Sequence, residues 1–465
     1  MNSYTIKEKL IPCDDVWDVI VAGGGPSGSA AAAAAAREGA KTLLIEQTGC
    51  LGGMGTSGLV PAWCPFSDGE KFIYGGIAKR VFEASKKGMA HVPDDAIHGW
   101  LPLDPEALKR IYDDLVTQSG AKILFNTQVA AVESDDGETI EAIIVANKSG
   151  LSAYKAKVFV DCTGDGDLAA WAGAEYKKGD EETGDLQPAT LCFILSNADS
   201  YAFTNGQEPL NNNKAGNWRF KESAIFKILD SGKYPEIKDA SMCGNLIGPG
   251  TIGINSGHVF GVDNTNPEST SKALMIGRKT SAALRNALAE FNPKIFANAH
   301  LTSTGSLLGI RETRRIVGDY YLTIEDYFRR RSFPDEIARN SYKIDVHASR
   351  GDLQDTKSYE GFQKYDNDDE TLKGLYTSFG KGESHGIPYR CLTPKGLKNI
   401  LIAGRCISTD RKVQGSVRVM PACLSTGEAA GMAAAHAVKQ ISVDVHAVDT
   451  KYLRERLIEV GGYLT

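Results

Sequence analysis

The sequence predicts an α/β fold in which a parallel sheet flanked by helices is interrupted by an inserted α+β domain. Residues 16–46 read as an apolar strand, a glycine-rich turn, an alanine-rich helix and a second strand, which is the order of a βαβ unit. The pattern returns near the end of the chain, where 397–404 is an apolar run closed by glycine and 421–438 is mostly small residues. Residues 181–385 are more polar, which predicts that they form a separate domain.

The elements of the first part follow from hydrophobic runs and capping residues. Asp104 and Pro105 mark a helix start, because aspartate caps free backbone N–H groups and proline fits the first turn. Residues 135–138 are typical of a hairpin turn between two strands. The expected elements are strands at 16–22, 41–46, 122–126, 128–134, 139–146 and 154–160, and helices at 27–38 and 105–119.

The rest of the chain is assigned by the same signals. Gly427 and Gly431 lie one turn apart and leave one face of their helix flat, which predicts the close approach of another element. The expected elements are strands at 189–196, 251–262, 304–321 and 397–404, helices at 269–291, 323–330, 421–438 and 449–460, and long loops at 204–217 and 349–370.

The glycine-rich turn after the first strand indicates dinucleotide binding. Gly23 permits the tight turn, Gly25 lets the backbone approach a pyrophosphate, and Gly28 lets the helix pack close to the sheet. The N-terminus of that helix directs free N–H groups and a positive dipole end at the phosphates. Glu46 follows Gly23 by 23 residues, close to the offset of about 20 for an acid that binds a ribose hydroxyl. The motif alone leaves FAD and NAD open.

Bulk properties exclude several classes of protein. The chain is 42% hydrophobic and 24% charged, with a net charge of −6, which argues against general attraction to nucleic acid or anionic lipid. No apolar run reaches the roughly 18 residues of a membrane span. The nine cysteines are odd in number and include no Cys-x-x-Cys pair, which favours a reducing compartment over a disulfide framework or zinc site. We therefore expect a cytoplasmic protein.

Motifs spread along the chain resemble one family. They include Leu51-Gly52-Gly53-Met54, Asp161-Cys162-Thr163-Gly164-Asp165, Gly309-Ile310-Arg311-Glu312-Thr313-Arg314-Arg315, Asp345-Val346-His347, Ile387-Pro388-Tyr389-Arg390 and Ala403-Gly404-Arg405-Cys406. In this order they are similar to the FAD-dependent oxidoreductase family of bacterial proteins, some of which carry a xanthan-lyase label. The match covers nearly the whole chain. The first and last segments together resemble a Rossmann-like FAD-binding domain of the glutathione-reductase type.

The resemblance implies FAD as cofactor and a set of residues around it. Gly23, Gly25 and Gly28 would surround the pyrophosphate, Glu46 would hold the adenosine ribose, and Val129 would lie at the adenine. The other implied cofactor-binding residues are Pro26, Ser27, Gln47, Gly52, Gly53, Met54, Thr163, Gly164, Asp165, Gly404, Arg405, Met420 and Gly427. The implied domains are an FAD-binding first part at 1–180, a substrate domain at 181–385, an FAD-binding second part at 386–440 and a C-terminal helix at 441–465.

FAD is favoured over NAD within the sequence itself. An NAD domain does not need the strand and helix that return at the C-terminal end, and no second nucleotide fingerprint is evident. Reoxidation is therefore expected to use oxygen, a protein carrier or another small molecule.

Candidate catalytic residues come from the inserted part. Arg311 suits recognition of a carboxylate or phosphate; on a strand, Arg311 and Arg315 would share one face and Arg314 the other. Asp345 and His347 have period-two spacing, and a histidine can take an alcohol proton near neutral pH. His258 is a further candidate. Structural ion pairs and a structural histidine at a domain seam are the competing interpretations.

Other polar groups are given structural roles. Cys50 is interpreted as a small filler of the glycine-rich loop rather than a covalent flavin anchor. The three acids of 161–167 lack the EF-hand spacing and its closing glutamate, so no metal is expected.

The expected function is hydride transfer between flavin N5 and a small polar metabolite; a hydroxylated or sugar-like compound is suggested by the family association alone. A flavin monooxygenase or halogenase is an alternative, although the halogenase pattern Trp-x-Trp-x-Ile-Pro is absent. A non-catalytic flavin-binding redox module is another. The expected partner is a small-molecule substrate, without nucleic acid or membrane, and a homo-oligomer is compatible with the sequence.

Overall fold

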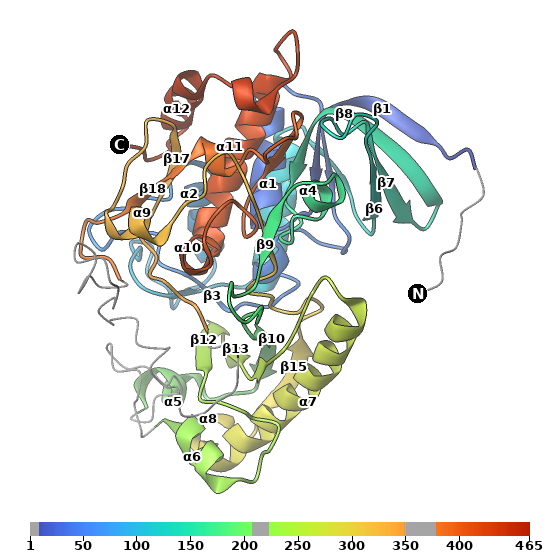
Figure 1. The fold of residues 1–465 in the computed structure, drawn as a ribbon. Coiled ribbons are helices and arrows are strands. Elements are labelled where there is room, and N and C mark those ends of the chain that lie inside the picture. Colours follow the sequence, from blue (N-terminus) through green and yellow to red (C-terminus); the bar gives the residue numbers. More distant parts are fainter. Residues whose placement is uncertain (1–8, 207–222, 348, 350–377) are drawn as a thin grey trace.

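A parallel-rich sheet lies at the centre of the computed structural model, which describes residues 9–206, 223–347, 349 and 378–465 (Figure 1). Among these residues the sheet has seven strands, in the order β5-β2-β1-β8-β7-β6 with β19 also paired to β8. Five are parallel: β1 (Cys13–Ala22), β2 (Thr42–Ile45), β5 (Lys122–Leu124), β8 (Gly150–Asp161) and β19 (Ile400–Ile402). β6 (Gln128–Glu133) and β7 (Ala142–Asn147) form an antiparallel meander with the first half of β8. The predicted α/β class is confirmed.

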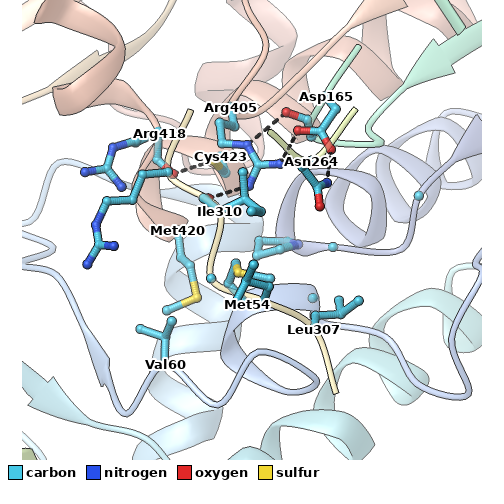
Figure 2. Close-up of a pocket in the computed structure, with 18 of the residues that line it drawn as sticks. Met54, Val60, Asp165, Asn264, Leu307, Ile310, Arg405, Arg418, Met420 and Cys423 are labelled. Carbon is cyan, nitrogen blue, oxygen red and sulfur yellow. Dashed lines mark hydrogen bonds and ion pairs between the residues drawn. The ribbon is translucent and has the colours of Figure 1, made fainter. Parts of the chain in front are cut away.

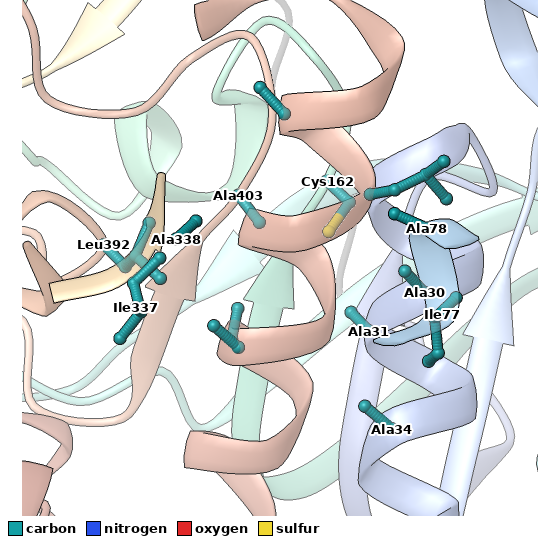
Figure 3. Packing of buried hydrophobic residues seen from close by; sticks show 14 of the residues in the cluster. Ala30, Ala31, Ala34, Ile77, Ala78, Cys162, Ile337, Ala338, Leu392 and Ala403 are labelled. Carbon is teal, nitrogen blue, oxygen red and sulfur yellow. The ribbon is translucent and has the colours of Figure 1, made fainter. Parts of the chain in front are cut away.

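Two helices of small residues, α1 (Pro26–Arg37) and α11 (Met420–Ala437), pack side by side next to this sheet (Figure 3). A Cβ on Gly427 would lie 2.1 Å from the carbonyl oxygen of Ser27, and one on Gly431 would lie 2.0 Å from that of Ala31. The two backbones therefore touch where only glycine fits, and the predicted flat face of α11 is confirmed. This contact holds the N-termini of both helices at the same side of the sheet.

The helix α2 (Gly76–Lys86) was not predicted, because its N-terminus depends on a residue far away in the sequence. The backbone N–H of Ile77 donates to Glu428 of α11 at 2.8 Å, and the same carboxylate accepts from Arg37 at 2.8 Å. A carboxylate at a helix N-terminus accepts hydrogen bonds from the free backbone N–H groups there. In α2 this carboxylate comes close only once the chain has folded. The helix α3 (Pro105–Gln118) begins as predicted, with Asp104 accepting from the N–H of Glu106 at 2.9 Å.

A second layer lies below the first in Figure 1. Among the described residues it is an antiparallel sheet of four strands in the order β12-β13-β11-β15. The strands are β12 (Met242–Gly248), β13 (Thr251–Ser256), β11 (Phe193–Ser196) and β15 (His300–Thr304), and α6 (Ala224–Ser231), α7 (Pro267–Phe291) and α8 (Pro293–Phe296) pack against them. This part has its own hydrophobic cluster, separate from that of α1 and α11.

The packing divides the segment 181–385 that the sequence analysis treats as one domain. Apolar side chains between Leu322 and Tyr342 pack in the cluster of α1 and α11 rather than with the four-stranded sheet. The strand β16 (Arg314–Ile316) pairs with β9 (Tyr176–Lys178), and its Ile316 packs in the hydrophobic cluster of the main sheet. Residues after about 312 therefore belong by contact to the first layer.

The strand predicted at 304–321 is wrong over most of its length. Within it, pairing is limited to β16, the last residue of β15 and two isolated bridges, at Gly309 and Gly318. Gly305 and Gly309 lie against backbone, since a Cβ on Gly309 would be 2.7 Å from the Thr190 carbonyl. The chain therefore bends twice here, and Arg311 lies on a loop rather than on a face shared with Arg315. Most of the loops expected at 204–217 and 349–370 lie outside the described residues.

Other described elements are short or peripheral. They are β3 (Ala62–Trp63), β4 (Leu101–Pro102), β10 (Ala189–Thr190), β14 (His258–Val259), β17 (Glu336–Asn340), β18 (His385–Pro388), α4 (Asp167–Trp171), α5 (Ser200–Asn205), α9 (Ile324–Phe328), α10 (Arg411–Val417) and α12 (Thr450–Glu459). Within the described part of the chain no helix combines the length and apolar character that crossing a bilayer requires.

Candidate active site

A cavity of about 1240 Å³ is lined by both layers. Its wall includes the turn after β1, the end of β2, the residues that follow β8 and the N-terminus of α11 on one side, and residues of β12, β13 and α7 on the other. In open α/β sheets, ligands bind at the carboxyl ends of the strands, and this cavity has that position.

The turn after β1 presents backbone to the cavity at Gly25. A Cβ built there would meet no atom within 4 Å, and its φ of −65° is ordinary for any residue. A Cβ on Gly28 would instead lie 1.7 Å from the carbonyl oxygen of Gly23. The two glycines therefore have different structural roles. Gly25 leaves space in the cavity at the start of α1, whereas Gly28 lets α1 pack against the turn at Gly23.

Glu46, just after β2, lies at the same end of the cavity. Its Oε2 accepts from the N–H of Gly24 at 2.6 Å, and its Oε1 accepts from the N–H of Thr48 at 2.7 Å. These bonds fix the carboxylate, and each oxygen keeps a further lone pair. Val129 lines the cavity beside it.

Arg405 connects several segments of the cavity wall by hydrogen bonds (Figure 2). It donates to the carbonyl of Gly164 at 2.9 Å, to that of Ile310 at 2.7 Å and to the carboxylate of Asp165 at 2.7 Å. Asp165 also accepts from Asn264 at 2.5 Å. This network ties the end of β8 to the loop that carries Arg311.

The N-terminus of α11 also borders the cavity. Val419 occupies the N-cap position without a side-chain hydrogen bond, Met420 is the first residue of the helix, and both line the cavity. Figure 2 shows Met420 with Met54 and Val60, which give this section an apolar wall. Because a helix N-terminus carries a positive partial charge, the section combines an apolar surface with a site for developing negative charge.

One section of the cavity wall is polar and mainly cationic. Arg311, Lys343, Asp345, His347 and Arg418 all line it. Arg311 is 8% exposed and its Nη1 donates to the carbonyl of Pro188 and the hydroxyl of Thr190, at 2.8 and 2.9 Å. The guanidinium is therefore held in a fixed orientation.

His347 belongs to a row of four titratable side chains. Its Nε2 lies 3.4 Å from Oδ1 of Asp345, and its Nδ1 lies 3.1 Å from Nε2 of His258. His258 in turn places its Nδ1 2.6 Å from Oδ2 of Asp239. Arg418 is 3.3 Å from the second oxygen of Asp345. The row runs from the cavity into the second layer.

Burial lowers the pKa of both rings. Burial, together with the cation of Arg311, lowers the pKa of His347 to about 3. Burial also lowers the pKa of His258, against the opposing effect of Asp239. Burial alone would raise the pKa of Asp345, but His347 and Arg418 bring it below its usual value.

Comparison with known proteins assigns the chain to a family. Residues 18–457 match the family described as FAD dependent oxidoreductase. The chain belongs to this family. No curated protein matches it.

The solved structures that match this chain have low sequence identity to it. A geranylgeranyl bacteriochlorophyll reductase-like protein from Thermoplasma acidophilum is 13% identical, with a TM-score of 0.46 over 97% of this chain and 85% of that chain. The p-nitrophenol 4-monooxygenase of Pseudomonas putida is 11% identical, with 0.45 over 96% and 84%. A myxobacterial chondrochloren halogenase is 14% identical, with 0.43 over 95% and 78%.

The protein is an FAD-dependent oxidoreductase, and the cavity fits its cofactor. An elongated dinucleotide needs an acid for the ribose, an approachable backbone for the pyrophosphate and a stabilising group for the flavin ring. Glu46, the empty space beside Gly25 and the N-terminus of α11 border one continuous cavity. No metal-binding cluster is found among the described residues.

The structure brings most of the predicted site residues to this cavity. Those that line it are Gly23, Gly25, Pro26, Ser27, Glu46, Gln47, Gly53, Met54, Val129, Thr163, Gly164, Asp165, Arg405, Met420, Arg311 and His347. Gly28, Gly52, Gly404 and Gly427 lie behind the wall, where a Cβ would meet protein atoms. His258 also lies behind it and reaches the cavity through His347. Cys50 is not part of the wall, and its Sγ is 3.1 Å from the hydroxyl of Ser57.

Several functional groups were missed from the sequence. Arg418 and Lys343 line the cavity, and Asp239 lies behind His258. Cys64, Cys192 and Cys243 come to its wall from three distant segments. No local pattern marks these residues. Only Lys343 stands near a motif that the sequence analysis singled out, two residues before Asp345-Val346-His347.

Proposed function

We propose that the FAD lies along the cavity with its adenosine at Glu46 and Val129, its pyrophosphate at Gly25 and its flavin ring at Met54 and Met420. Two proximities support this placement: Glu46 accepts from the N–H of Gly24, next to Gly25, and Sδ of Met420 lies 3.2 Å from the position of a Cβ on Gly55, next to Met54. The fold is proposed to be of the glutathione-reductase type. Its support is the five-stranded parallel sheet combined with the β6-β7-β8 meander, built from distant chain segments.

The residues beyond the proposed flavin ring suit oxidation of an alcohol or similar polar group. The cofactor, when bound, supplies an acceptor for a hydride. His347 is neutral, so its ring can take the hydroxyl proton. Arg311 is held rigidly at the same end and would orient an anionic or strongly polar group of the substrate. The cationic wall therefore favours a polar metabolite that carries a carboxylate or several oxygens.

The proposed substrate domain is the second layer. The four-stranded sheet contributes Cys243, Asn245 and Asn255 to the cavity, and α7 contributes Thr270 and Leu274. Amide side chains can both donate and accept hydrogen bonds, which suits recognition of hydroxyl groups. We place this domain at residues from about 187 to about 311, since the chain after that packs with the first layer.

An anaerobic reduction screen tests the function. The purified, FAD-loaded protein is mixed without oxygen with sugars, hydroxy acids and amines, and the absorbance near 450 nm is followed. A compound of the first two groups is expected to bleach the flavin directly, and His347→Ala is expected to slow the bleaching while its FAD content stays normal. If only a reduced nicotinamide bleaches the flavin, and a second compound is hydroxylated once oxygen is admitted, the monooxygenase alternative replaces this proposal.

A further inference from the structure

Two tryptophan side chains of the cavity wall are largely exposed. Among the large apolar side chains that are well exposed in the described residues, the two that border the cavity are Trp100, 48% exposed, and Trp171, 44% exposed. The other described tryptophans, Trp17 and Trp63, are buried. Tryptophan is usually buried over most of its surface, and aromatic side chains in the wall of a pocket are typical ligand contacts. Each of the two therefore marks a place where a ligand can cover an aromatic ring.

The two tryptophans border different sections of the cavity. The ring of Trp100 lies 5.9 Å from that of Tyr342, centroid to centroid, and the Tyr342 hydroxyl lies 3.5 Å from Oδ2 of Asp345. Trp100 thus belongs to the polar section of the wall. Trp171 is the last residue of α4, and α4 packs against β6 and β8 of the main sheet (Figure 1).

The position of α4 places Trp171 in the section that Val129 borders. Val129 lies on β6, and Val129 and Ala170, the residue before Trp171, pack against the same hydrophobic cluster. Val129 and Trp171 both line the cavity. The indole therefore lies on the side of the cavity where the adenosine is proposed to bind.

The backbone of α4 is held in place independently of its tryptophan. Oδ2 of Asp161 accepts from the N–H of Ala169 at 3.0 Å, and the hydroxyl of Thr163 accepts from the N–H of Asp167 at 3.0 Å. Ala169 is fully buried, whereas Trp171 is not part of the core. The helix therefore presents the indole to the cavity from a fixed backbone, and a preorganised ring costs a ligand little ordering entropy on binding.

The charged side chains next to Trp171 are paired with each other. Asp167, four residues earlier, lies 2.7 Å from Arg314, and both line the cavity. Arg314 also donates to the carbonyl of Asp165 at 3.3 Å. Opposite charges this close largely cancel at longer range. The surroundings of the indole therefore suit a flat, uncharged group of a ligand better than a phosphate.

We propose that the indole of Trp171 stacks on the adenine ring of the bound FAD. The inference rests on the proposed placement of the cofactor, in which the adenosine lies at Glu46 and Val129. Every nucleobase has a π face on which an aromatic side chain can stack. The contact gives the protein a means to select FAD over FMN, because FMN has no adenine.

The affinities for two flavins test the stack. FAD is removed from the full-length protein, circular dichroism checks that the fold is retained, and binding of FAD and of FMN is followed by flavin fluorescence. Trp171→Ala should bind FAD about 5- to 150-fold more weakly, which is the effect of alanine substitution on one base–aromatic stack, and its FMN affinity should not change. Trp171→Phe should restore most of the FAD affinity. Wild-type FAD affinity in Trp171→Ala overturns the proposal, and so does an equal loss for both flavins.

Tryptophan emission reports on the ring itself. ADP carries the adenosine and the pyrophosphate without a flavin, and at saturation it should quench part of the emission of the cofactor-free wild type. In Trp171→Phe this quenching should disappear, although equilibrium dialysis still shows bound ADP. Trp100→Phe is the matched control, because Trp100 is similarly exposed at the same cavity, and it should keep the quenching. No quenching in the wild type, or quenching that survives in Trp171→Phe, contradicts the stack.

Gly25→Val separates this proposal from the placement of FAD on which it rests. The valine side chain would fill the space proposed for the pyrophosphate, so this variant should bind neither FAD nor ADP. If Gly25→Val loses FAD while Trp171→Ala keeps wild-type affinity, the placement stands and the stack is wrong. If Gly25→Val binds FAD normally, the placement is wrong, and the stack is wrong with it.

Discussion

At the scale of single residues, two glycines of one motif have opposite structural surroundings. A Cβ on Gly25 meets open cavity, whereas a Cβ on Gly28 would lie 1.7 Å from the carbonyl oxygen of Gly23. The motif spacing predicted both as cofactor-binding residues. It also predicted a different role for each, approach of the backbone to a pyrophosphate at Gly25 and close helix packing at Gly28, and the coordinates show packing at Gly28 and open cavity at Gly25.

Gly25→Val should therefore lose the cofactor and keep the fold. Its φ of −65° suits a branched residue, and the side chain would occupy the space proposed for the pyrophosphate. We expect a colourless protein with a near-normal circular dichroism spectrum, measured with its flavin content. Gly28→Val is the control and should be destabilised by about 1–3 kcal/mol or more, because overpacking displaces backbone. A yellow Gly25→Val protein would contradict the placement.

The Arg311 cation should affect the pH below which the reaction slows. It contributes to the low pKa of His347, about 3, so Arg311→Gln should raise that pKa. The rate needs a neutral ring, so the acidic limb of the pH–rate profile should move to higher pH. Arg314→Gln is the control, because Arg314 also lines the cavity but pairs with Asp167 at 2.7 Å. An acidic limb that stays in place would show that Arg311 does not act on His347.

At the scale of elements, local sequence signals predicted those built from long runs of apolar or small residues, with local caps at α3 (Asp104) and α7 (Asn266). The helices α1, α3, α7 and α11 and the parallel strands fall close to their expected ranges. The helix α2 was missed because Glu428 caps it from another part of the chain. The strand predicted at 304–321 was wrong because tertiary contacts, rather than alternation between two faces of a strand, decide where its apolar and arginine side chains lie. Arg315, for example, is fully buried and pairs with Glu312 at 2.8 Å.

The contact of α1 with α11 should control both stability and cofactor binding. In Gly431→Val, the added side chain would meet the Ala31 backbone 2.0 Å away and push the helices apart. The N-termini of both helices border the cavity, so thermal stability and FAD affinity should fall together. Ser425→Ala on the same helix, whose hydroxyl bonds only weakly to the Pro421 carbonyl at 3.3 Å, should change neither by much. Normal FAD affinity in Gly431→Val would argue against this coupling.

At the scale of the whole molecule, the sequence predicted that two distant chain segments contribute to one sheet, and β19 does pair with β8 in the sheet that contains β1. It did not predict that residues near 322–342 return to the first layer, because that return depends on packing rather than on composition. The far wall of the cavity was missed for the same reason. Arg418, Asp239 and the cysteines come together only through the tertiary fold.

Protonation of a histidine outside the cavity should contribute to the unfolding of the protein in acid. Burial lowers the pKa of His385 to about 4, whereas an unfolded histidine titrates near 6.5. The unfolded chain binds this proton first, so stability should fall as the pH drops from about 6.5 to 4. His385→Gln should flatten that part of a plot of Tm against pH, and His300→Gln, at an exposed position, should not. An equal slope in both variants would contradict the assignment.

The structure of the FAD complex tests the central claim most directly. We predict that the flavin ring lies between Met54 and Met420 and that His347 and Arg311 both face a substrate position on its exposed side. A reactive proton must lie within direct or one-water hydrogen-bond reach of its base. If both side chains lie more than about 10 Å from flavin N5, beyond that reach, the catalytic assignment is wrong even though the protein binds FAD.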